Sequence, residues 1–176
     1  MSTTKWVLDP THSELQFKVK HLMITTVTGH FGVLESEVTT EDNDFSTAKI
    51  SFKAAVDSIN TGNEQRDGHL KSDDFFSTEK YSHLVFESTQ IEKKNEEEFT
   101  IHGNLTIREV TLPISLKAEL GGIAKDPWGN LKAGFTVSGV INRKDFGLTW
   151  NAVTESGGLL VSEDVRLAAE IQYVKS

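Results

Sequence analysis

The chain has 176 residues, which is enough for one domain that buries an apolar core without a disulfide or a metal to hold it together. It contains no cysteine, so disulfides, thiolate metal sites and cysteine nucleophiles are excluded. Its 26 acidic and 18 basic side chains give a net charge of -8, which argues against nucleic acid and anionic membrane surfaces as partners.

Apolar residues recur with a period of two along most of the chain, which predicts strands with one buried face and one solvated face. In chain order, strands are predicted at about 14–20, 31–38, 49–56, 84–86, 99–107, 114–120, 133–141 and 165–171. Segments rich in Gly, Asn, Asp or charge predict turns at 41–44, 93–98, 108–110 and 121–130.

Residues 63–81, NEQRDGHLKSDDFFSTEKY, interrupt this alternation. A stretch from Ser72 to Asp74 that resembles a helix cap precedes Phe75 and Phe76. We therefore expect one or two short helices here, crossing one end of the sheet structure.

Amphipathic strands joined by hairpin turns close as a barrel or stack as a two-layer sandwich. The predicted strands are long, and the run from Leu84 to Ile171 has no helix that would cover a sheet edge, which favours closure. The sequence thus predicts an all-β, single-domain protein over residues 1–176: an eight-stranded antiparallel up-and-down barrel with a short helical insert at about 63–81.

A barrel of eight strands is either filled by its own side chains or keeps a cavity for one ligand. The predicted inner faces mix phenylalanines with Ala54, Gly103, Ala133 and Gly139, and we expect these small residues to leave volume. The predicted cavity wall consists of Phe17, Val19, Phe31, Ile50, Phe52, Phe86, Leu105, Phe135, Ile141 and Trp150. This wall carries no charge, so the cavity suits a hydrocarbon; a fully packed core is the alternative.

Polar residues that suit the polar end of such a ligand gather near the start of the chain, in the insert and near residue 143. The predicted contacts are His12, His21, Arg66, His69 and Arg143. A guanidinium gives a bidentate contact to phosphate or carbonyl oxygens, but pairing with a nearby acid or with backbone carbonyls is the alternative for each arginine. The histidines show no metal-binding spacing, and no catalytic constellation is found, so we expect neither a metal nor a cofactor.

Five blocks in order carry a family likeness: WVLDPTHSELQFKVKHLMITTVTGHFG, SINTGNEQRDGHLKSDDFF, GNLTIREVTLPISL, DPWGNLKAGF and INRKDFGLTWN. Together they resemble the YceI-like family of polyisoprenoid-binding proteins, from Trp6 to about Ile171. The resemblance implies an extended lipocalin-like barrel whose interior takes up a long isoprenoid, such as a polyprenyl phosphate or pyrophosphate or the tail of a quinone.

Two features depart from that family. The sequence shows no signal peptide, which predicts a cytoplasmic protein where many relatives are periplasmic. Glu109 stands where relatives commonly have glycine, which concerns that turn alone.

The leading hypothesis is a protein that carries or stores an isoprenoid lipid and is not an enzyme. No apolar run is long enough to span a bilayer, so the lipid must be enclosed by the protein. One alternative is an enzyme that acts on such a lipid with His12, His21 or His69 as acid or base. Another is a packed barrel that binds a protein partner on its outer surface, and an exposed barrel strand offers a route to a homodimer.

Overall fold

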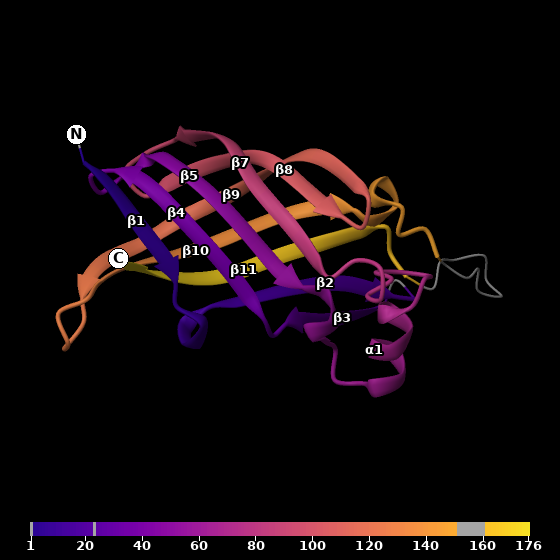
Figure 1. Ribbon diagram of the computed structural model, residues 1–176. Helices are drawn as coiled ribbons and strands as arrows, with labels where there is room; N and C mark the ends of the chain where they lie inside the picture. The colour runs from indigo at the N-terminus through magenta and orange to yellow at the C-terminus, as the bar shows by residue number, and fades with distance from the viewer. Residues whose placement is uncertain (1, 23, 151–160) are drawn as a thin grey trace.

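The computed structural model describes residues 2–22, 24–150 and 161–176. Antiparallel strands form a sheet in the order β1-β4-β5-β7-β8-β9-β10-β11, and this sheet closes on itself because β1 also pairs with β11 (Figure 1). The strands of this ring are β1 (Thr3–Leu8), β4 (Leu34–Glu41), β5 (Asp44–Ala55), β7 (His83–Lys93), β8 (Glu98–Ile107), β9 (Val110–Lys125), β10 (Leu131–Asn142) and β11 (Asp164–Lys175). The predicted eight-stranded antiparallel barrel is confirmed.

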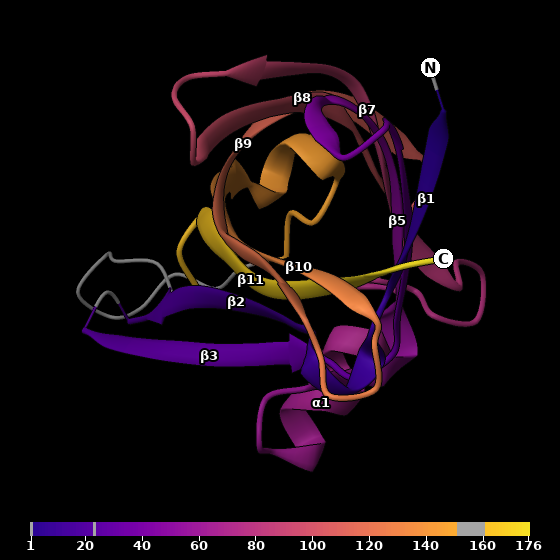
Figure 2. The same ribbon diagram turned by 90° about the vertical axis from the view of Figure 1, so that its left-hand side faces the viewer.

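Three further strands extend the sheet beyond the ring: β2 (Glu14–His21), β3 (Thr25–Phe31) and β6 (Ile59–Asn60). Strand β11 pairs with β2 through residues 166–170 and with β1 through residues 173–175, so two consecutive strands share one partner. The 3-10 turn η1 (Pro10–His12) redirects the chain between them. Figure 2 looks along the barrel and shows the β2–β3 hairpin lying outside the ring.

The prediction of one strand at about 31–38 is wrong, because the chain forms β3 and β4 with a break at Gly32 and Val33. Phe31 is buried and Val33 is about half exposed, so the inward face shifts by one residue at this break. An unbroken strand cannot follow such a shift.

The turn predicted at 121–130 is also too long, since β9 continues to Lys125. Gly121 has no partner in the β9–β10 register, so the glycine pair at 121–122 forms a bulge opposite Gly134. Glycine in a strand is typical of a bulge as well as of a turn, and the sequence pattern does not separate the two.

The insert forms the α-helix α1 (Glu64–Lys71), followed by turns up to Lys80. The side chain of Asn63 caps this helix by accepting a hydrogen bond from the Arg66 N–H, and no residue of α1 is buried. Figure 1 places α1 at the end of the barrel opposite the chain termini. Among the described residues, no helix has the length and apolar character needed to cross a bilayer.

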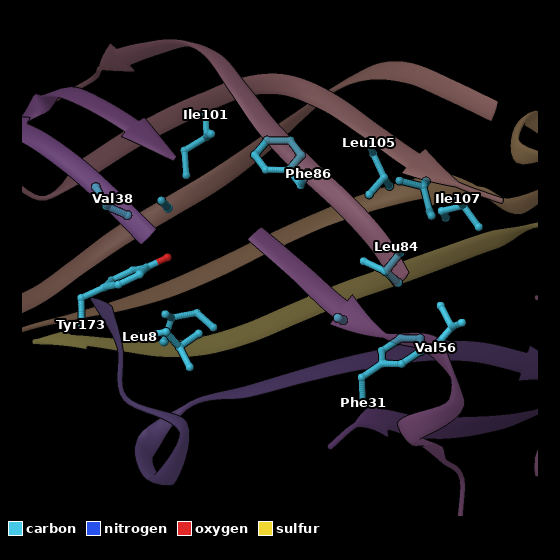
Figure 3. Close-up of a cluster of buried hydrophobic side chains, with 14 of the residues drawn as sticks. Leu8, Phe31, Val38, Val56, Leu84, Phe86, Ile101, Leu105, Ile107 and Tyr173 are labelled. Carbon is cyan, nitrogen blue, oxygen red and sulfur yellow. The ribbon is translucent and has the colours of Figure 1, made fainter. Parts of the chain in front are cut away.

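The core lies inside the ring. Figure 3 shows Phe86 of β7, Leu105 of β8 and Tyr173 of β11 pointing into a common interior. Two more 3-10 turns follow strands of the ring, η2 (Val56–Ser58) and η3 (Arg143–Phe146), and η3, in orange, crosses the far end of the ring in Figure 2. Phe146 of η3 is buried, so this turn contributes to closing that end.

Candidate functional site

The barrel encloses an apolar cavity of about 150 Å³. Its lining comes mostly from inward side chains of the ring, joined by Leu15 of β2 and Phe31 of β3. Ser138 and Tyr173 are the polar residues among those that line it. Four residues of β8 line the cavity, and the first and last of them are Phe99 and Ile107. These two positions are separated by about 26 Å at 3.3 Å per residue, so the cavity is long and narrow.

Most of the predicted wall residues line this cavity: Phe31, Ile50, Phe52, Phe86, Leu105, Phe135 and Ile141. Phe17, Val19 and Trp150 do not. Phe17 and Val19 lie on β2, outside the ring, where the Phe17 ring packs 5.5 Å from that of Phe31. Leu15, two residues earlier on the same face of β2, does line the cavity, so alternation identifies the buried face of a strand but not how much of that face borders the cavity.

The small residues expected to leave volume do not line the cavity. A Cβ atom at Gly103 would lie 2.5 Å from the Phe86 ring, and one at Gly139 would lie 2.5 Å from Leu116, so neighbouring side chains fill both places. Small lining residues are found instead at Ala48, Ala118, Ala168 and Ala169. The interior around Gly103 and Gly139 is thus filled by the protein's own side chains.

One end of the cavity is closed by a row of four rings, Trp6, Phe45, Phe135 and Tyr173, which we call the aromatic floor. Ring centroids are separated by 4.9 Å between Trp6 and Phe45, 4.9 Å between Phe45 and Phe135, and 6.2 Å between Phe135 and Tyr173. Phe45 follows the β4–β5 turn and lies among polar residues, so no alternating pattern marks it as buried. Trp6 is fully buried, so the floor leaves no path to solvent at this ring.

The polar atoms of the floor form hydrogen bonds with other side chains of the protein. The Trp6 Nε1–H donates to Thr40 Oγ1 at 3.1 Å. The Tyr173 hydroxyl donates to Ser36 Oγ at 2.8 Å, and Ser36 in turn donates to the Ser51 carbonyl. Burial raises the pKa of Tyr173 to about 12, so this hydroxyl stays neutral at ordinary pH.

The opposite end carries a second aromatic group, the mouth cluster, formed by His69, Phe75 and Trp150. The His69 ring lies 4.6 Å from the Trp150 ring and 5.1 Å from the Phe75 ring. His69 Nε2 lies 2.9 Å from Asp74 Oδ2, and about a third of the His69 side chain is exposed. The mouth cluster therefore presents both apolar rings and a polar group at the same end of the barrel.

The residues predicted to contact the polar end of a ligand lie on separate elements. His12 lies in η1 and pairs with Asp9 at 2.9 Å, while His21 ends β2. Arg66 lies on α1 with His69, and its guanidinium donates to Thr61 Oγ1 and to the Thr61 carbonyl, both at 2.7 Å. Within residues 2–22, 24–150 and 161–176, no three His, Asp or Glu side chains converge to hold a metal ion.

Arg143 is buried and bonds to backbone carbonyls. Its Nε donates to Ser162 O at 2.9 Å, its Nη1 donates to Leu148 O at 2.6 Å and Trp150 O at 2.8 Å, and its Nη2 donates to Val161 O at 3.3 Å. Burial lowers the pKa of this guanidinium. Of the two roles considered for Arg143, the structure gives it the pairing with carbonyls, which leaves few donors for a ligand.

Asp9 fixes the bend between β1 and β2. Its carboxylate accepts hydrogen bonds from the Thr11 N–H and hydroxyl, at 3.0 and 2.7 Å, and from Lys132 Nζ at 2.9 Å. These bonds, with that of the Thr11 hydroxyl the strongest influence, hold the pKa of Asp9 far below its usual range. His12, which also pairs with Asp9, is thus part of a structural network on the wall of the barrel.

Comparison with known proteins identifies relatives over nearly the whole chain. The profile of the YceI-like domain matches residues 6–173. The UPF0312 protein SA2479 of Staphylococcus aureus is 37% identical over 171 residues, which are 97% of each chain. The crystal structure of the Campylobacter jejuni YCEI protein is 34% identical with a TM-score of 0.78, covering 89% of this chain and 90% of that one.

Two more distant structures share the fold. Burkholderia cenocepacia BcnA has a TM-score of 0.81 at 16% identity, covering 94% of this chain and 98% of its own. A polyisoprenoid binding domain from Saccharophagus degradans has a TM-score of 0.70 at 18% identity, covering 97% of this chain and 98% of its own.

Proposed function

The chain belongs to the YceI-like domain family, and from this premise we propose that it binds a long-chain isoprenoid lipid inside the barrel. One observation carries the proposal: inward side chains of the ring form an apolar cavity that runs along most of β8. The shared fold of the Saccharophagus degradans polyisoprenoid binding domain supports the choice of ligand class. The role is to carry or store the lipid, whose polar end is a phosphate, a pyrophosphate or a quinone ring.

Burial of the hydrocarbon supplies the affinity. Each methylene removed from water contributes about 0.8 kcal/mol, so ten of them contribute about 8 kcal/mol before the cost of association. Only the part of this gain that exceeds the cost of association appears as affinity, and a dissociation constant on the order of 1 μM needs a net gain of about 8 kcal/mol. The chain length would then decide the affinity, and the polar end would decide the orientation.

The width of the cavity sets a condition on binding. An apolar cavity of about 150 Å³ holds a molecule the size of benzene, which is much smaller than a polyprenyl chain. Lining side chains such as Phe52 and Leu116 must therefore change rotamer when the lipid enters. The lipid-bound barrel is wider than the empty one.

We place the polar end of the lipid at the mouth cluster. His69 is partly exposed there, Arg66 lies on the same helix, and α1 has no buried residue that would hold it rigidly. At the other end, the polar groups of Trp6 and Tyr173 already have partners inside the protein. A charged headgroup thus stays in contact with water only at the mouth.

A binding protein also fits the histidines better than an enzyme does. His12 pairs with Asp9 in η1, His21 ends β2 and forms a bridge with Val161, and His69 lies in the mouth cluster. An enzyme that used two of these histidines as acid and base would need both within reach of the same substrate atoms. The arrangement of these three side chains gives no support to such a pair.

The test is native mass spectrometry of the purified chain, followed by titration with a prenyl quinone and a polyprenyl phosphate. We expect co-purified lipid or saturable uptake of one of these probes. The variant Ala169→Phe places a ring in the cavity and should lower the affinity at least tenfold, whereas Val140→Phe, at a position that is 60% exposed, should not. No co-purified lipid together with no uptake would contradict the proposal.

A further inference from the structure

We propose that the aromatic floor sets the length of the hydrocarbon chain that the cavity accepts, with Phe45 as the residue that stops the chain. This inference rests on the proposed function and adds a specificity-determining residue to it. Its evidence is the layered arrangement of the floor and the difference between the two ends of the barrel.

The floor is layered along the cavity. Phe45, Phe135 and Tyr173 line the cavity, whereas Trp6 does not. The Trp6 ring lies 4.9 Å from that of Phe45 and is fully buried, so it forms the layer behind Phe45. A chain that advances along the cavity therefore meets the Phe45 ring last.

The floor is also held more firmly than the mouth. Strand β1, which carries Trp6, pairs with β4 on one side and with β11 on the other, so the wall is continuous there. The Trp6 indole is fixed by its hydrogen bond to Thr40. Near the mouth, α1 lies beside the ring (Figure 2) and has no fully buried residue, and its Leu70 is only partly buried against the core. Elements with few buried contacts open most readily, so the lipid enters at the mouth and its tail ends at the floor.

The length of the cavity can be expressed in isoprene units. The 26 Å of strand between Phe99 and Ile107 corresponds to about 20 Å along the barrel axis, because barrel strands tilt by about 40°. An extended chain advances about 1.2 Å per bond, so an isoprene unit with four main-chain bonds spans about 5 Å. The cavity thus accepts about four units, and further units remain outside the mouth.

Changes at the floor should move this limit by a predictable amount. Phe45→Ala removes a ring layer that is 4.9 Å deep, as judged by its spacing from Trp6, which corresponds to about one isoprene unit. Ala118→Phe does the reverse, because Ala118 lines the cavity and is the register partner of Phe99 at the same end. The two substitutions should therefore shift the limit in opposite directions.

The experiment measures affinity for prenyl monophosphates of two to eight isoprene units, using the full chain and a folding check by circular dichroism. For the wild type, we expect the dissociation constant to fall with each unit up to about four and then to level off. The break should move to about five units in Phe45→Ala and to about three in Ala118→Phe. Phe45→Leu, which is safer for folding, should move it in the same direction as Phe45→Ala by less than one unit.

Phe146→Ala is the matched control, because Phe146 is buried in η3 and does not line the cavity. It should leave the break at the wild-type length. If the wild type binds none of the probes, the proposed function itself fails. If the wild type binds with a break that none of the floor variants moves, or that Phe146→Ala moves equally, the floor proposal is overturned while lipid binding stands.

Discussion

The two ends of this barrel are both closed by aromatic rings, yet they are built differently. The aromatic floor belongs to strands of the closed ring, and the polar atoms of Trp6 and Tyr173 both bond to side chains of β4. The mouth cluster draws His69 from a helix without a buried residue and Trp150 from the segment after η3. Similar side chains thus form a wall within the ring at one end and, at the other, a cluster that draws on a helix and on segments between strands.

The largest expected effect is at the floor. Trp6→Ala should lower the free energy of unfolding by about 3–5 kcal/mol, because it removes a fully buried large side chain. Trp128→Ala is the matched control, since Trp128 is 83% exposed and its loss should change stability by no more than about 0.5 kcal/mol. Urea denaturation measures both, and equal losses would contradict the structure of the floor.

A second substitution tests the hydrogen bonds of Arg143 near the mouth. Arg143→Met should lower the free energy of unfolding by about 2–4 kcal/mol, because several buried carbonyls lose a charged donor at once. Arg166→Met, at an exposed position of β11, should be nearly neutral. If Arg143→Met left the free energy of unfolding nearly unchanged, the carbonyls of this segment would have other donors, and Arg143 would not be what holds η3 in place.

A smaller effect is expected for the hydroxyl of Tyr173. Tyr173→Phe should cost about 1 kcal/mol at pH 7 by removing the hydrogen bond to Ser36. The pKa of this phenol is about 12 in the folded chain and about 10 in the unfolded chain, so the wild type is fully stabilised below pH 10 and loses stability as the pH rises toward 12. Urea denaturation at pH 7 and 11 should show a loss that the variant lacks, and identical losses would indicate that Tyr173 is not buried.

The smallest expected effect concerns the helix α1. Gly68 lies within α1 and has open space around it, so Gly68→Ala should stabilise the helix by about 0.5–1 kcal/mol. Hydrogen exchange should show α1 amides protected about two- to fivefold more strongly, with the ring strands unchanged. If the ring amides gained the same protection, α1 would open only together with the barrel, and the contrast between the two ends would disappear.

The period of two predicted the barrel, and seven of the ten predicted wall residues line the cavity, because burial repeats on one face of each strand, as in Phe52 and Phe135. It did not predict that Phe17 and Val19 lie outside the ring, because that depends on which partner β11 chooses along its length. The carbonyl partners of Arg143 leave no pattern in the sequence either, since every residue carries a carbonyl.

The glycines on the predicted inner faces also do not enlarge the cavity. The sequence predicts that Gly103 and Gly139 enlarge the cavity, but neighbouring side chains can fill the space that a missing side chain leaves. Phe86 and Leu116 occupy the space instead. Interiors pack densely, so a missing Cβ predicts a close contact more reliably than it predicts a void.

The pairing of β1 with β11 has a consequence for anyone who shortens or extends this chain. Three residue pairs join these strands, Trp6 with Lys175, Val7 with Val174 and Leu8 with Tyr173. Deleting residues 173–176 would remove these three pairs, open the cylinder between β1 and β11, leave the outer edge of β1 bare, and invite association between copies.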